Sequence, residues 1–168
     1  MARTQVFRHM MPRDIPPFCS FLLSPEGQQF TSWEFDVIVG EPEDPGALYD
    51  LNKRRQAMYL NALKIDAIGW FFNTPTLIEA KPDADIGAIG QIDSYADWYR
   101  MLYGVMPAKM IVCNAMRRQV QTVCQWHDIQ VRIFQDASPL DIQTATAYIL
   151  PKIKASPLFP NPLVIPRS

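Results

Sequence analysis

The stretch LIEAKPDADIGAIGQIDSYADWY, residues 77–99, decides the fold. It opens with an apolar run typical of a buried strand, yet this run carries Glu79 and Lys81 two residues apart. Because residues two apart in a strand point to the same face, a carboxylate and an ammonium are expected side by side. Apolar residues then recur at steps of three and four. We therefore predict a strand over residues 76–81 and a helix over residues 84–103.

The flanking segments extend this pattern to an α/β fold. KIDAIGWFF, residues 64–72, is separated from the 76–81 strand by the turn NTP, which predicts a β-hairpin. Residues 33–42 favour a strand and residues 49–63 a helix. Further along, a strand, a helix and a strand alternate, which indicates parallel pairing, and a last helix is expected at residues 140–150. The predicted fold is a mixed central sheet flanked by helices.

The chain length indicates a single domain over residues 1–168, because domains commonly run about 100 to 200 residues. Within it, residues 33–150 form the predicted core. Prolines at four positions of residues 1–32 disfavour continuous helix or central strand, so an N-terminal arm or a set of loops is expected there. Residues 151–168 are also proline-rich and are predicted to form a C-terminal arm. Arms of this kind are suited to contacting a protein partner or a second copy.

Composition excludes several classes of protein. Apolar residues make up 48% and charged residues 20%, as in an ordinary globular protein, and the net charge of −1 gives no global attraction to nucleic acid. Cys19, Cys113 and Cys124 lack the spacing of a disulfide framework or a zinc site and are interpreted as small core residues. No apolar run approaches the length of a membrane span. We expect a cytoplasmic protein with no membrane contact.

The charged strand residues predict a metal site. Across the hairpin, Asp66 is expected close to Glu79, beside Lys81. Two carboxylates held together repel unless a cation lies between them, and hard cations such as Mg²⁺ prefer oxygen ligands. Such a metal can lower the pKa of bound water and neutralise charge on a phosphoryl oxygen. These parts fit phosphodiester hydrolysis.

The order of these residues resembles the PD-(D/E)xK nuclease superfamily, which has a restriction-endonuclease-like fold. Asp66 is followed by EAK at residues 79–81 and by QIDSY at residues 91–95, and the last motif resembles the QxxxY motif of the exonuclease-like branch. Gln91 and Tyr95 share one helix face because they lie four residues apart. The resemblance covers about residues 64–136.

The resemblance implies a role for each residue. Asp66, Glu79 and the backbone carbonyl of Ala80 would hold Mg²⁺ or Mn²⁺, Lys81 would contact the attacking water or the scissile phosphate, and the two QxxxY side chains would point back to the site. The implied activity is that of a metal-dependent deoxyribonuclease acting on DNA. Many members carry a further acid on a helix before the Asp strand. The helix predicted here offers only Asp50 at its edge, and the sequence does not decide whether acids further upstream reach the site: Glu34, Asp36, Glu41 and Glu43.

Plainer interpretations stay open for each feature. The acidic and basic strand residues can form a structural ion pair, and the QxxxY residues can belong to a solvated helix surface. The basic runs at residues 53–55 and 117–118 either contact phosphates or are solvated, and Trp70, Trp98 and Trp126 either stack on bases or belong to the core.

Two other functions compete with an active nuclease. The first is a non-catalytic structural or assembly protein, for example of a phage virion, because one fold hosts many functions. This alternative implies a location in the virion. The second is a nuclease subunit whose DNA recognition comes from a partner.

Overall fold

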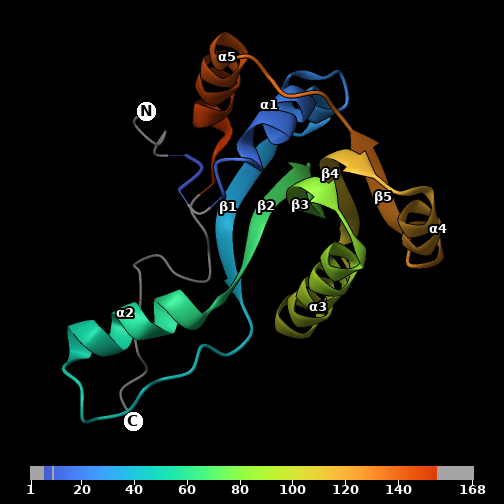
Figure 1. Ribbon diagram of the computed structural model, residues 1–168. Coiled ribbons are helices and arrows are strands. Elements are labelled where there is room, and N and C mark those ends of the chain that lie inside the picture. The colour runs from blue at the N-terminus through green and yellow to red at the C-terminus, as the bar shows by residue number, and fades with distance from the viewer. Residues whose placement is uncertain (1–5, 9, 155–168) are drawn as a thin grey trace.

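The computed structural model describes residues 6–8 and 10–154 (Figure 1). The strands are β1 (Ser32–Val39), β2 (Leu63–Phe71), β3 (Thr74–Ala84), β4 (Ala108–Met116) and β5 (Ile129–Ile133). The helices are α1 (Ile15–Leu23), α2 (Leu51–Asn61), α3 (Ile86–Tyr103), α4 (Arg118–Trp126) and α5 (Pro139–Ile149), with short 3₁₀ turns η1 (Gly27–Gln29) and η2 (Leu150–Lys152). Within the described residues, no helix is long and apolar enough to cross a membrane.

The five strands form one mixed sheet in the order β1-β2-β3-β4-β5. β1, β2 and β3 are antiparallel neighbours, whereas β4 and β5 run parallel to β3. The parallel pairs are joined through α3 and α4, as the alternation of strands and helices predicted. The predicted α/β fold with a mixed central sheet and flanking helices is confirmed.

Helices cover both faces of the sheet (Figure 1). On one face, α3 and α4 contribute residues such as Ile92 and Cys124 to a cluster that includes Leu77 of β3. On the other face, α1 and α5 pack against a cluster that includes Trp33 and Ala80. The middle of β3 is buried on both faces, so residues 77–81 are apolar except for Glu79 and Lys81 of the candidate site.

The N-terminal segment is not an arm throughout. α1 begins at Ile15, with Pro16 and Pro17 in its first turn, where a missing N–H leaves no helical hydrogen bond unmade. Phe18 and Phe21 of this helix are 0% exposed and pack under the sheet. The prediction of loops over residues 1–32 is therefore wrong for α1, which is part of the core.

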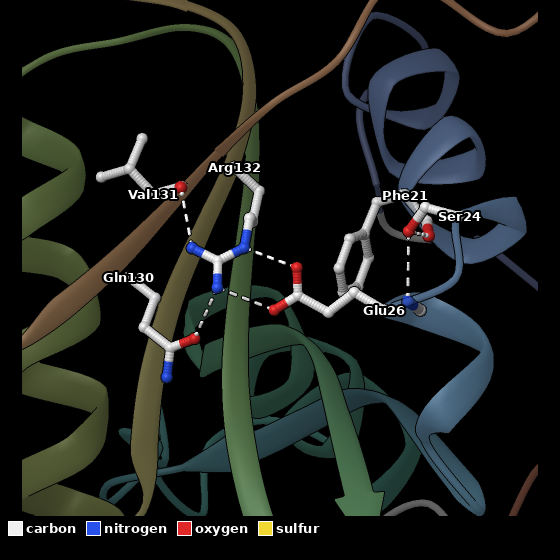
Figure 2. A network of polar contacts seen from close by, with 7 residues as sticks. Phe21, Ser24, Glu26, Gln130, Val131 and Arg132 are labelled. Carbon is white, nitrogen blue, oxygen red and sulfur yellow. Dashed lines mark hydrogen bonds and ion pairs between the residues drawn. The ribbon is translucent and has the colours of Figure 1, made fainter.

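Segments far apart in the chain fasten the sheet edges. Figure 2 shows Arg132 of β5 bonded to Glu26, which follows α1, with Nε to Oε2 at 2.6 Å and Nη2 to Oε1 at 2.8 Å. At the opposite edge, Ile153 pairs with Trp33 of β1, and the Lys154 N–H donates to the Trp33 carbonyl at 2.7 Å. The rest of the predicted C-terminal arm, from residue 155 on, lies outside the described residues.

α2 is an excursion between β1 and β2, and it extends away from the sheet (Figure 1). None of its residues is buried. Asp50 caps its first turn by accepting a hydrogen bond from the Lys53 N–H at 3.0 Å, and Arg54 pairs with Asp44. Two of its three basic side chains are therefore engaged with nearby acids, since the Lys53 ammonium also lies 3.6 Å from Asp50.

β1 contains an irregularity at Asp36. Phe35 packs on the α1 face of the sheet and Val37 on the α3 face, although residues two apart in a regular strand share a face. Asp36 between them has a φ of 55°, a conformation uncommon for a residue other than glycine. The β1–β2 register is interrupted here, between the pairs Phe35–Ala67 and Val37–Ile65, and β2 changes face over the same step. The irregularity thus sits at the first residue of the candidate site.

We predict that Gly27→Ala lowers the free energy of unfolding by roughly 1–3 kcal/mol, because a Cβ at this position would lie 2.0 Å from the Phe21 carbonyl oxygen and the backbone after α1 would have to move. Gly90→Ala is the matched control, since a Cβ there meets nothing within 4 Å and a helix gains stability from alanine. Urea unfolding of both variants measures the difference. Equal stability of the two would contradict the close packing of α1.

Candidate functional site

Neighbouring strands bring the predicted charged residues together. Asp66 lies on β2, and Glu79 and Lys81 lie on β3. The Ala80 N–H donates a hydrogen bond to Asp66 Oδ2 at 3.0 Å, which fixes this carboxylate against β3. The Lys81 ammonium lies 3.0 Å from Glu79 Oε1. The hairpin register therefore produces a cluster of two carboxylates and one ammonium.

Glu79 is the most unusual member of the cluster. Its side chain is 1% exposed, and neither carboxylate oxygen accepts a well-aligned hydrogen bond, because Lys81 is close to Oε1 but poorly directed. Burial, followed by repulsion from Asp66, raises the pKa of Glu79 to about 8, although Lys81 acts in the opposite direction. A buried carboxylate without a full set of partners is costly unless a cation or a proton neutralises it.

Burial and neighbouring charges also shift the pKa values of Asp66 and Lys81. Burial raises the pKa of Asp66 to about 6, against the Ala80 hydrogen bond and the Lys81 charge, which favour the ionised form. Burial opposes the charged form of Lys81, but attraction to Glu79 and Asp66 raises the pKa of this lysine. Near neutral pH, Glu79 is therefore largely protonated, and Lys81 balances the remaining negative charge of Asp66.

Gln91 and Tyr95 of α3 line the same cavity as Asp66 and Lys81. Gln91 Nε2 donates to the Tyr95 hydroxyl oxygen at 2.8 Å, so the pair acts as one unit on the helix. Tyr95 is buried, and this burial, together with the nearby carboxylates Glu79 and Asp66, raises its pKa. The pair therefore lies within electrostatic reach of the acidic residues.

These residues meet at a polar cavity of about 310 Å³. Its walls come from β1, β2, β3, α3 and the segment before α1. The lining residues are Met11, Asp14, Asp36, Ala62, Lys64, Asp66, Lys81, Gln91 and Tyr95. Glu79 does not line the cavity. It adjoins the wall through Lys81.

Two acids that the sequence analysis did not assign line this cavity. Asp14 precedes α1 and is 5% exposed, and burial raises its pKa against the charge of Lys81. Asp36, the residue with positive φ, comes from β1. A local signal for Asp14 existed, since an acid followed by Ile-Pro-Pro is typical of a helix start. Asp14 and Asp36 thus add two upstream acids to the cavity, whereas Asp50 of α2 does not line it.

The other upstream acids lie elsewhere. Glu34 is buried, and its Oε2 accepts a hydrogen bond from Trp70 Nε1 at 2.8 Å. Glu41 and Glu43 are exposed in the loop before α2. None of the three lines the cavity.

The donor set fits a cation bound by few protein ligands. No group of three acidic, histidine or cysteine side chains among residues 6–8 and 10–154 is arranged to hold one ion. The remaining donors are the two carboxylates of Asp66 and Glu79 and the Ala80 carbonyl. The Glu79 oxygens, which accept no well-aligned hydrogen bond, support a cation here, because a hard divalent ion would supply a further partner.

A larger cavity, of about 510 Å³, lies apart from this cluster. It is formed by the first turns of α3 and α4 and contains Asp85 and Arg117. None of the residues in the acidic cluster lines it, and we base the chemistry on the smaller cavity because the buried charges are there.

The remaining sequence candidates lie outside the site. Of the tryptophans left open between base stacking and the core, Trp126 is 76% exposed, whereas Trp70 and Trp98 are partly buried and pack against the core. Cys19, Cys113 and Cys124 are free and buried, as expected of small core residues.

We predict that Glu79→Gln stabilises the metal-free protein at alkaline pH. The folded-state pKa of Glu79 is about 8, against an ordinary value of 4.5, so the stability present below pH 4.5 is lost as the pH rises toward 8. The uncharged amide should remove this loss, which is on the order of 5 kcal/mol, at about 1.4 kcal/mol for each pKa unit. Chemical unfolding in EDTA at a series of pH values measures it, with Glu43→Gln as the exposed control. Parallel pH profiles of wild type and Glu79→Gln would show that the buried charge has no cost.

Among known proteins, this chain is similar only in part to two solved structures described here. No family model matches the chain, and no curated protein matches it. Among solved structures, a repair endonuclease from Pyrococcus abyssi is 18% identical, with a TM-score of 0.39, over 43% of this chain and 33% of that one. EndoMS from the EndoMS-dsDNA2 complex is 9% identical, with a TM-score of 0.47, over 77% of this chain and 47% of that one. The chain therefore spans less than half the length of either structure, and the likeness concerns part of the backbone arrangement.

Proposed function

We propose that this protein is a metal-dependent nuclease that hydrolyses phosphodiester bonds in DNA. The observation that carries the proposal is the Glu79 carboxylate, which is buried with both oxygens lacking well-aligned hydrogen bonds. Asp66 lies beside it, and the pKa values of both acids are raised by burial. Displaced pKa values of residues in and beside a polar cavity are typical of functional sites. The order of the sequence motifs supports a restriction-endonuclease-like site of the exonuclease-like branch.

The proposed cofactor is Mg²⁺ or Mn²⁺. Asp66, Glu79 and the Ala80 carbonyl would hold it, because all three supply the oxygen ligands that these ions prefer. When bound, such an ion lowers the pKa of a coordinated water and neutralises charge on a phosphoryl oxygen.

The side chains around the acids have distinct proposed roles. Lys81 lines the cavity beside Glu79, where its ammonium can orient the attacking water or bind the scissile phosphate. Gln91 and Tyr95 form one hydrogen-bonded unit on the opposite wall, and we assign them to positioning the DNA backbone. The net charge of the chain is −1, so the attraction for DNA must be local to this cavity.

We predict that Mn²⁺ or Mg²⁺ raises the thermal unfolding midpoint of the wild type in a dose-dependent way, because an ion that binds only the folded state stabilises it. Glu79→Gln should abolish most of this shift by removing a charged ligand. Glu34→Gln is the matched control, since Glu34 is also a buried acid but lies outside the cavity. Equal shifts in all three proteins would place the ion elsewhere.

We predict that purified protein cleaves DNA only with Mg²⁺ or Mn²⁺, and that Glu79→Gln and Lys81→Met each lose at least about 100-fold in rate. Glu34→Gln should keep the wild-type rate. Linear, circular and single-stranded substrates, compared on gels, also reveal whether the enzyme requires a free end.

The competing function is an assembly protein on the same fold. Failure of the folded wild type to cleave any of these substrates, together with no metal-dependent stabilisation, would favour this alternative. Metal binding without cleavage would instead favour a subunit that requires a partner for DNA recognition.

A further inference from the structure

A second lysine faces the same cavity as Lys81. Lys64 lies on β2, two residues before Asp66, and its side chain lines the cavity wall together with Ala62. Lys64 lies close to the end of α2 because β2 begins two residues after that helix ends.

The Lys64 ammonium is held in place by the end of α2. Its Nζ donates a hydrogen bond to the Tyr59 carbonyl oxygen at 2.5 Å and lies 4.3 Å from the centroid of the Tyr59 ring. The last carbonyls of a helix lack intrahelical partners and carry partial negative charge, so this end of α2 attracts a cation. α2, which buries none of its own residues, thereby fixes a charged group at the cavity.

This ammonium retains capacity for another ligand. None of the ion pairs among the described residues includes Lys64, whereas Lys81 is paired with Glu79. An ammonium has three donors, and the Tyr59 carbonyl uses one of them. Burial lowers the pKa of Lys64, and the charge of the neighbouring Asp36 opposes this shift. The side chain is therefore a positioned cation with free donors.

We propose that Lys64 binds a backbone phosphate of the DNA strand, next to the phosphate that is cleaved. This inference rests on the proposed nuclease function and assigns α2 a role in it. Three acids line the cavity, namely Asp14, Asp36 and Asp66, so a polyanion needs a cation beyond Lys81 to approach. The competing interpretation is that Lys64 only caps α2.

A matched pair of variants separates the two interpretations. Lys152 lies on η2, outside the cavity, and copies the local chemistry of Lys64, because its Nζ bonds the Tyr148 hydroxyl oxygen at 2.6 Å and lies 4.2 Å from the ring centroid. Lys64→Met and Lys152→Met each remove one charge and one contact with a tyrosine ring. Lys64→Arg restores the charge at the cavity.

The experiment measures fluorescence anisotropy of a short labelled DNA duplex, with calcium in place of magnesium, at several salt concentrations. Lys64→Met should bind roughly five- to tenfold more weakly at about 0.1 M salt, and the slope of log affinity against log salt should become shallower by about 0.9, as for one lost phosphate contact. Lys152→Met should match the wild type, and Lys64→Arg should recover most of the affinity. In cleavage, Lys64→Met should raise KM more than it lowers kcat.

The affinity, the salt slope and the cleavage activity of the Lys64 variants together test the phosphate contact. Wild-type affinity and slope in Lys64→Met, while the wild type still cleaves DNA, would overturn the phosphate contact and leave the nuclease intact. A weakened affinity with an unchanged slope that Lys64→Arg does not restore would also overturn it and favour a capping role. If DNA binding depends on Lys64 but the protein cleaves no substrate, the phosphate contact would be supported and the proposed nuclease function would be rejected.

Discussion

The structure depends on the cost of burying the Glu79 carboxylate beside Asp66. Two acids at the centre of a sheet repel each other, and one lysine at 3.0 Å offsets only part of that repulsion. The surrounding elements must therefore hold the hairpin closed by other means. α1 and α5 on one face and α3 and α4 on the other supply apolar packing, and the Ala80 N–H holds Asp66 in position.

Strand periodicity made much of this site predictable. Residues two apart share a face, so Glu79 and Lys81 were expected together, and a two-strand hairpin with a short turn brought Asp66 to them. The helix with Gln91 and Tyr95 followed from its apolar spacing. Strand alternation, a short turn and helical spacing each involve residues close together in the chain, so the sequence alone can predict them.

The parts that the sequence did not reveal arise from tertiary packing. Pro16 and Pro17 were interpreted as helix breakers, yet in the first turn of a helix they are compatible with it. Asp14 is distant from Asp66 along the chain, and only the docking of α1 under the sheet joins them. The face change at Asp36 depends on a single positive φ, which no periodicity indicates.

The fastening of the two sheet edges has a consequence for solubility. An open edge strand offers unpaired backbone groups to another chain, which is a common route to aggregation. Here β5 is short and its Arg132 forms an ion pair with Glu26. At the other edge, Ile153 forms a β-bridge with Trp33 of β1. Both edges thus have obstacles to intermolecular strand pairing, so the chain can keep an apolar, two-sided central strand while limiting self-association through the sheet.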